Sequence, residues 1–201
     1  MKNEWQTRQT LLLRAKNQDD DAAWEEFVRY YSGFIHMVLH KMNLYQVDFD
    51  DLAQEILLRI WKSLPDFIYD QDRAQFRTWL GRLIRNQVLD HIRSTERRTR
   101  KHSAVADEME SSARVMDEPE MGKIIEEEWK LHIVQLALRN ISTLFSARAI
   151  EAFRMSIDGK STAEIAARFD VKPNSVVKLK NRVKERLVIE INHLRNELES
   201  P

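Results

Sequence analysis

One stretch of this sequence places amide and cationic side chains where they could form hydrogen bonds with nucleic-acid bases. Between residues 173 and 187, apolar side chains recur at three- and four-residue intervals, so they share one side of a helix. Asn can pair bidentately with adenine, Lys can reach the acceptors of guanine, and flanking cations can hold phosphates. The candidate contacts to duplex nucleic acid, on or beside the opposite side, are Lys172, Asn174, Ser175, Lys178, Asn181 and Arg182.

The residues just before this helix predict how it is positioned. Ser161 and Glu164 have the spacing of a capping box, and a short helix through Phe169 follows them. Asp170 to Lys172 then form a tight turn, and Pro173 suits the first position of the next helix. This pattern favours a helix-turn-helix, which inserts its second helix into the major groove. The alternative is that the cations only solvate an exposed helix.

A second group combines aromatic rings with cations. Exposed bases stack on aromatic rings while cations follow the backbone, so this combination suits single-stranded nucleic acid. Trp61, Phe76 and Trp79 lie on apolar helix faces, where core packing is expected. Phe67 and Tyr69 fall in a predicted loop and are the better candidates for touching bases.

Helices must position both groups. Only four Gly and four Pro occur in 201 residues, which favours an all-α fold with almost no strand. A helix from Phe76 to about Arg93 has one packing side and one largely polar, basic side. Its neighbour starts at the acidic residues 48–51 and stops at Pro65. Further helices are expected over about 5–16, 21–42, 124–140 and 146–158.

The charge pattern predicts two domains and a linker. The formal net charge is zero, yet residues 73–101 hold nine Lys and Arg against two acids, and residues 103–128 hold nine acids against two bases. The stretch around 95–122 has little hydrophobic periodicity and contains Pro119 and Gly122. We expect two small helical domains, 1–98 and 123–201, joined by a flexible acidic linker, 99–122, the second domain being a helix-turn-helix.

Several classes of protein are disfavoured. No Cys is present, no segment resembles a signal peptide, and no apolar run approaches the roughly 18 residues of a membrane span, so a cytoplasmic protein is expected. No phosphate-binding loop, dinucleotide turn or nucleophile motif occurs, which predicts no enzyme, no catalytic residue and no cofactor. His36 and His40 are spaced like metal ligands but lack a third ligand nearby, so no metal site is expected.

Two sequence blocks resemble a known family. Residues 50–61, DDLAQEILLRIW, and residues 76–93, FRTWLGRLIRNQVLDHIR, are similar to the sigma factors of bacterial RNA polymerase. They resemble in particular the compact extracytoplasmic-function (ECF) group of the sigma-70 family. The resemblance covers sigma region 2 from about Asp20 to Arg98 and, less sharply, sigma region 4 from about Ile124 to Leu194.

The resemblance implies roles for particular residues. The first block implies contacts to the clamp coiled coil of the largest polymerase subunit through Asp51, Gln54, Glu55 and Arg59. Residues 67–72, which include Phe67 and Tyr69, would form the loop that captures a flipped promoter base. The residues that would line the melted minus-10 strand are Arg82, Arg85, Asn86 and Arg93. The duplex-contacting residues at 172–182 would read the minus-35 element.

The implied protein is a monomeric initiation factor whose partners are core RNA polymerase and promoter DNA, with an anti-sigma factor as a further possible partner. The second module departs from the family where 141–146 read ISTLFS and where Lys178 and Leu179 replace a frequent Ser-Arg pair. A free-standing helix-turn-helix regulator that binds duplex DNA alone is the rival hypothesis, and an RNA-binding adaptor is a third. A regulator that binds only duplex DNA would not need the aromatic and basic segment between Trp61 and Arg93.

Overall fold

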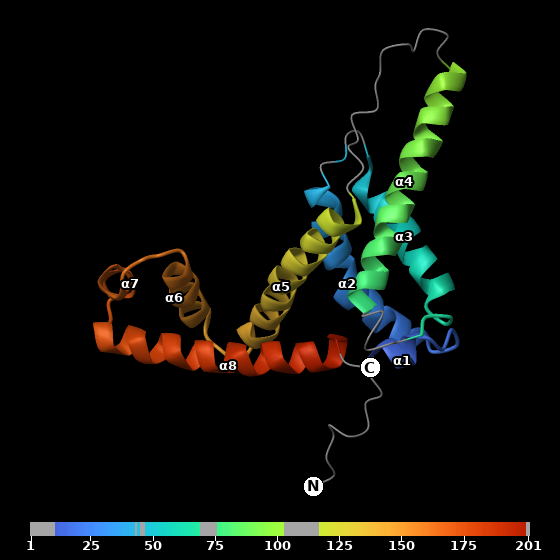
Figure 1. Ribbon diagram of the computed structural model, residues 1–201. Helices are drawn as coiled ribbons and strands as arrows, with labels where there is room; N and C mark the ends of the chain where they lie inside the picture. Colours follow the sequence, from blue (N-terminus) through green and yellow to red (C-terminus); the bar gives the residue numbers. More distant parts are fainter. Residues whose placement is uncertain (1–10, 43, 45–46, 69–75, 103–116, 200–201) are drawn as a thin grey trace. The chain divides into compact units, whose positions relative to one another are not determined.

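The computed structural model describes residues 11–42, 44, 47–68, 76–102 and 117–199, and these form eight α-helices with no strand among them (Figure 1). The predicted all-α class is therefore confirmed. The chain divides into two compact units. Unit 1 comprises residues 1–130 together with 198–201, and unit 2 comprises residues 131–197.

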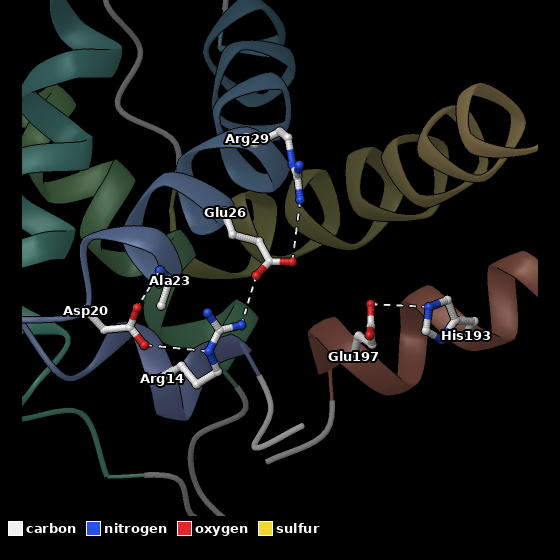
Figure 2. Close-up of polar contacts among 7 residues, drawn as sticks. All are labelled: Arg14, Asp20, Ala23, Glu26, Arg29, His193 and Glu197. Carbon is white, nitrogen blue, oxygen red and sulfur yellow. Dashed lines mark hydrogen bonds and ion pairs between the residues drawn. The ribbon is translucent and has the colours of Figure 1, made fainter. Parts of the chain in front are cut away.

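Unit 1 contains α1 (Leu11–Ala15), α2 (Asp21–Lys41), α3 (Phe49–Ser63), α4 (Phe76–His102) and residues 118–130 of α5 (Glu118–Ser142). Asp20 begins α2 because its carboxylate accepts a hydrogen bond from the Ala23 amide at 2.9 Å (Figure 2). The same carboxylate lies 3.6 Å from Arg14, which also donates to Glu26 at 2.9 Å. These contacts connect α1 to the start of α2.

Buried apolar lines from four helices form the core of unit 1. The aromatic residues Phe27, Tyr31 and Phe34 of α2 are fully buried. α3 contributes Leu52, Ala53, Ile56 and Ile60, and α4 contributes Leu80, Ile84 and Val88. Trp129 of α5 completes this core, stacking on Tyr31 at 5.6 Å between ring centroids and meeting Phe34 edge-on at 5.1 Å. The first half of α5 is thus an integral part of unit 1.

α4 and α5 are longer than the sequence pattern predicts. α4 continues to His102 rather than ending near Arg93, because residues 94–102 contain neither Gly nor Pro and include good helix formers. α5 begins at Glu118, where the Asp117 carboxylate accepts a hydrogen bond from the Glu120 amide at 2.8 Å. Pro119 therefore lies in a first helical turn, where no amide is needed. Both ends of the expected linker, 99–102 and 118–122, are helical, and residues 103–116 lie outside the described ranges.

Unit 2 contains residues 131–142 of α5, α6 (Ala147–Ile157), α7 (Thr162–Phe169) and α8 (Pro173–Glu199) through Glu197. Ala152, Ile165, Ala166 and Val176 form a buried cluster shared by α6, α7 and α8, with Met155, Phe169 and Leu179 packed against it. Along α8, His193 lies 3.4 Å from Glu197 one turn later (Figure 2). The cluster fixes the start of α8 against α6 and α7.

Local capping sets the turns around α7. Both bonds of the predicted capping box are present, since the Glu164 amide donates to the Ser161 hydroxyl at 3.2 Å and the Ser161 amide donates to the Glu164 carboxylate at 2.8 Å. Asp170 ends α7 in the left-handed region at φ 51°, a conformation that Asp tolerates better than most side chains. α8 then begins at Pro173, as the sequence predicts.

Among the helices in the described ranges, none has the length and apolar character needed to span a membrane.

Candidate functional site

The exposed side of α3 carries the first set of predicted contact residues. Asp51, Gln54, Glu55 and Arg59 are all exposed and form one stripe along the helix. The opposite side of α3 is buried in the core of unit 1. Leu58 lies on the same stripe with 52% of its surface exposed, and it is not among the residues that the family resemblance implies. Its spacing of seven residues from Asp51 was the signal that could have identified it.

Neighbouring groups hold this stripe in place. Asp48 caps α3, and its carboxylate accepts hydrogen bonds from the amides of Asp50 at 3.0 Å and Asp51 at 3.2 Å. The Glu55 carboxylate accepts a hydrogen bond from the Gln87 side chain of α4 at 3.2 Å, and the His91 ring nitrogen lies 3.9 Å from it. One carboxylate of the stripe is therefore positioned by the adjacent helix.

The predicted strand-binding residues of α4 are not equally accessible. Asn86 and Arg93 are exposed, and Arg93 lies 3.6 Å from Asp90 on the same helix. Arg82 is exposed as well, but its guanidinium lies 3.8 Å from the Glu118 carboxylate of α5. Arg85 is half-buried. Arg82 and Arg93 are thus similarly exposed and each lies near a carboxylate, but the acid beside Arg82 comes from α5, whereas the acid beside Arg93 comes from α4 itself.

The structure places Phe67 in the core, in contrast to its expected place on an exposed loop. Its ring is 6% exposed and packs against Phe76 and Trp79, with ring centroids 5.7 and 5.1 Å away. Its carbonyl oxygen accepts a hydrogen bond from the Lys16 ammonium group. A ring held in this way has no free face for stacking on a base. Tyr69, the second predicted base contact, lies outside the described residues.

The start of α8 carries the third set of predicted contact residues, those expected to bind duplex DNA. All six predicted residues are exposed: Lys172, Asn174, Ser175, Lys178, Asn181 and Arg182. The opposite side of α8 is buried through Val176, Val183 and Leu187. The Lys172 carbonyl accepts a hydrogen bond from the Ser175 amide at 2.9 Å, which closes the first turn. Two amides and three cations therefore face solvent along about three helical turns.

Comparison with known proteins identifies the first of these regions. Residues 27–98, which include the α3 stripe and most of α4, match the family profile of sigma-70 region 2. The ECF RNA polymerase sigma factor SigE of Mycolicibacterium smegmatis is 28% identical over 71 residues, which cover 35% of this chain and 26% of that protein. The ECF RNA polymerase sigma factor RpoE of Cereibacter sphaeroides is 25% identical over 83 residues, covering 41% and 45%.

The chain thus spans less than half the length of both curated relatives in these matches. Among solved structures, CnrH in complex with the cytosolic domain of CnrY is 19% identical, covers 91% of this chain and 96% of that one, and has a TM-score of 0.34. That score is too low to support any structural argument. The profile match and the two relatives agree, so residues 27–98 are similar to region 2 of the sigma-70 family, and the two relatives are members of its ECF group.

Proposed function

We propose that this chain is a sigma factor that binds core RNA polymerase through the α3 stripe, stabilises a melted minus-10 strand with α4, and reads a minus-35 duplex with the start of α8. The observation that carries the proposal is the stripe formed by Asp51, Gln54, Glu55, Leu58 and Arg59, which is exposed although the opposite side of α3 is fully packed. The chain breaks and makes no covalent bond in this scheme.

The α3 stripe has the composition of a protein-binding surface. Leu58 supplies an exposed apolar side chain, and Asp51, Glu55 and Arg59 along the same stripe supply charges of both signs. Apolar centres with polar rims are typical of specific interfaces, and complementary charges raise the association rate and exclude wrong partners. The clamp coiled coil of the polymerase is the proposed partner. An anti-sigma factor that covers the same stripe would prevent this docking.

The basic side of α4 suits a melted strand. Arg82, Arg85 and Arg93 can follow a phosphate backbone, and the Asn86 amide can donate to and accept from an unpaired base. Base stacking would have to come from a ring other than Phe67, or from Phe67 after it leaves the core. Trp79 packs against Phe67 and is only half-buried, so it is the alternative ring for stacking on a base.

The start of α8 suits a duplex. Its exposed amides at Asn174 and Asn181 can read base edges in the major groove, with Lys178 between them and with Lys172 and Arg182 placed toward phosphates. We propose that α7, the turn at Asp170 and α8 act together as a helix-turn-helix. Since DNA affinity is divided between two modules whose spacing the polymerase sets, the free chain should bind DNA weakly.

The first experiment is binding to core RNA polymerase on a native gel, with an excess of housekeeping sigma factor as competitor. The wild-type chain should form a stoichiometric complex that the competitor displaces. Asp51→Lys should abolish the complex while leaving the helical circular-dichroism signal unchanged, because the side chain is exposed. Glu25→Lys, the same charge change at an exposed position of α2, is the matched control and should bind normally.

Two outcomes would contradict the proposal. Normal binding by Asp51→Lys would remove α3 as the docking surface. Failure of the wild-type chain to bind polymerase, together with nanomolar affinity for duplex DNA, would favour the free-standing regulator. The match to sigma-70 region 2 does not favour that rival.

A further inference from the structure

The basic side of α4 has a partner within its own unit. The Arg77 guanidinium donates a hydrogen bond to the Glu126 carboxylate at 3.1 Å, and Arg82 lies 3.8 Å from Glu118. Both acids belong to the first half of α5. Arg82 is one of the residues proposed to hold the melted strand, so the Glu118 carboxylate would compete with a phosphate for the same guanidinium.

A close approach of the two helices supports these ion pairs. A Cβ atom added to Gly81 of α4 would lie only 2.8 Å from Cγ1 of Ile125, so a larger side chain fits there only if the Ile125 side chain or α5 shifts. Gly is an unfavourable residue in a helix interior, and packing is a physical reason for its presence. Met121 and Ile125 are both buried, which makes this contact largely apolar.

An open hollow lies beside the contact between Gly81 and Ile125. A hollow of about 600 Å³ is lined by both helices, and its wall includes Arg82 and Arg85 from α4 and Glu118 and Glu126 from α5. Arg85 is half-buried there. Arg82 and Arg85 therefore share this hollow with two carboxylates of α5, although Arg82 also remains open to solvent.

We propose that residues 118–130 of α5 are an internal competitor for the melted strand, and that they must leave α4 before Arg82 and Arg85 can bind it. The inference rests on the proposed function of α4. The carboxylates of Glu118 and Glu126 take the place of phosphates, and Trp129 anchors the segment in the core of unit 1. A site that is open only part of the time has its apparent affinity reduced by the open fraction.

An engineered disulfide provides a reversible test. The Cβ position at residue 81 lies 3.8 Å from the Cβ of Ile125, a typical spacing for a disulfide, and the chain has no Cys of its own. Gly81→Cys combined with Ile125→Cys should therefore cross-link on oxidation and hold α5 on α4. The probe is a fluorescein-labelled oligothymidine of about 15 nucleotides, roughly one single-strand site, and the readout is fluorescence anisotropy at low salt.

The reduced double variant should bind the oligonucleotide at least about tenfold more tightly than the oxidised form, an open-fraction effect, and reductant should restore binding to the oxidised sample. Each single Cys variant should be insensitive to reductant. If the cross-link does not form, or if both redox forms bind equally, the inference is wrong. Binding of the same samples to core polymerase is measured in parallel. The wild-type chain is included, and loss of its polymerase binding would count against the proposed function instead, because the docking stripe on α3 contains neither substituted residue.

A second pair of variants leaves the buried residues intact. Glu118→Gln with Glu126→Gln removes the carboxylates that face α4, whereas Glu120→Gln with Glu127→Gln removes the same charge from positions that have no ion pair to α4 among the described contacts. The first variant should bind oligothymidine about two- to fivefold more tightly than the second at low salt, and the difference should vanish at high salt as screening removes it. Equal binding by the two variants at low salt would overturn the inference.

Discussion

α4 and α8 are similar helices in different surroundings. Each is 27 residues long, and each has a buried apolar side opposite a polar side rich in Lys and Arg. The six candidate residues at the start of α8 are all exposed. On α4, Arg77 and Arg82 have carboxylate partners from α5, and Arg85 is half-buried.

This difference shows that a Lys or Arg on a helix surface is not always available to bind DNA. The basic character of both helices follows from their own residues, but Glu126 lies 49 residues after its partner Arg77. A neighbouring acid reduces the field that a phosphate would meet, and the cation must lose that partner before it binds another. We therefore expect the α8 surface to bind DNA in the free chain with the weak affinity of an open basic surface, and the α4 surface to depend on the position of α5.

The largest expected effect comes from removing the anchor of α5. Trp129→Ala should destabilise unit 1 by about 3–5 kcal/mol, the usual cost of replacing a buried Trp, because Trp129 is 2% exposed and stacks on Tyr31. Urea unfolding followed by circular dichroism measures the change.

Leu131→Ala, two positions later, is the matched control. Its side chain is 53% exposed, so the substitution should change stability by no more than about 0.5 kcal/mol. A similarly small effect of Trp129→Ala would mean that the first half of α5 is not part of unit 1 in solution, and the contrast between α4 and α8 would disappear.

The next effect concerns the open surface of α8. Arg182→Ala should weaken binding to a random-sequence duplex of about 25 base pairs and reduce the slope of log affinity against log salt by about one, because one phosphate contact is lost. Asn181→Ala, an exposed neighbour without charge, should leave this slope unchanged. Fluorescence anisotropy at several salt concentrations measures both. An unchanged slope for Arg182→Ala would place duplex binding elsewhere.

The smallest effect concerns the capping box of α7, the helix that precedes α8, and tests whether Ser161 and Glu164 form it in solution. The pKa of Glu164 is lowered from its ordinary value, first by the hydrogen bond from the Ser161 amide and then by the Ser161 hydroxyl. A depressed folded-state pKa means that the capping interaction stabilises α7 above the ordinary pKa of 4.5 and is lost as the pH falls through the lowered value.

Carbon-13 NMR of the Glu164 carboxyl group should therefore give a titration midpoint below 4.5 in the folded chain. The Ser161 amide shift should follow the same midpoint, and Glu164→Gln should remove that pH dependence. A midpoint at or above 4.5 would show that the capping box is not formed in solution.

Several features could be predicted from the sequence because they depend on nearby residues. The helix starts at Asp20, Asp48 and Ser161 each follow from a side chain that caps amides two or three residues later. The exposed stripes of α3 and α8 follow from helical spacing alone. These contacts lie within one helical turn, so local residue types are sufficient to specify them.

Other features were decided only by the tertiary structure. Phe67 lies in a segment whose local pattern resembles a loop, and its burial depends on Phe76 and Trp79. Pro119 and Gly122 resemble linker residues, yet Met121, Ile125 and Trp129 turn the same segment into a core element of unit 1. Burial of apolar area drives such packing without direction, so its partners come from any distance along the chain. Composition and spacing identify the cations of α4, whereas the packing of α5 determines which of them lie beside a carboxylate of another helix.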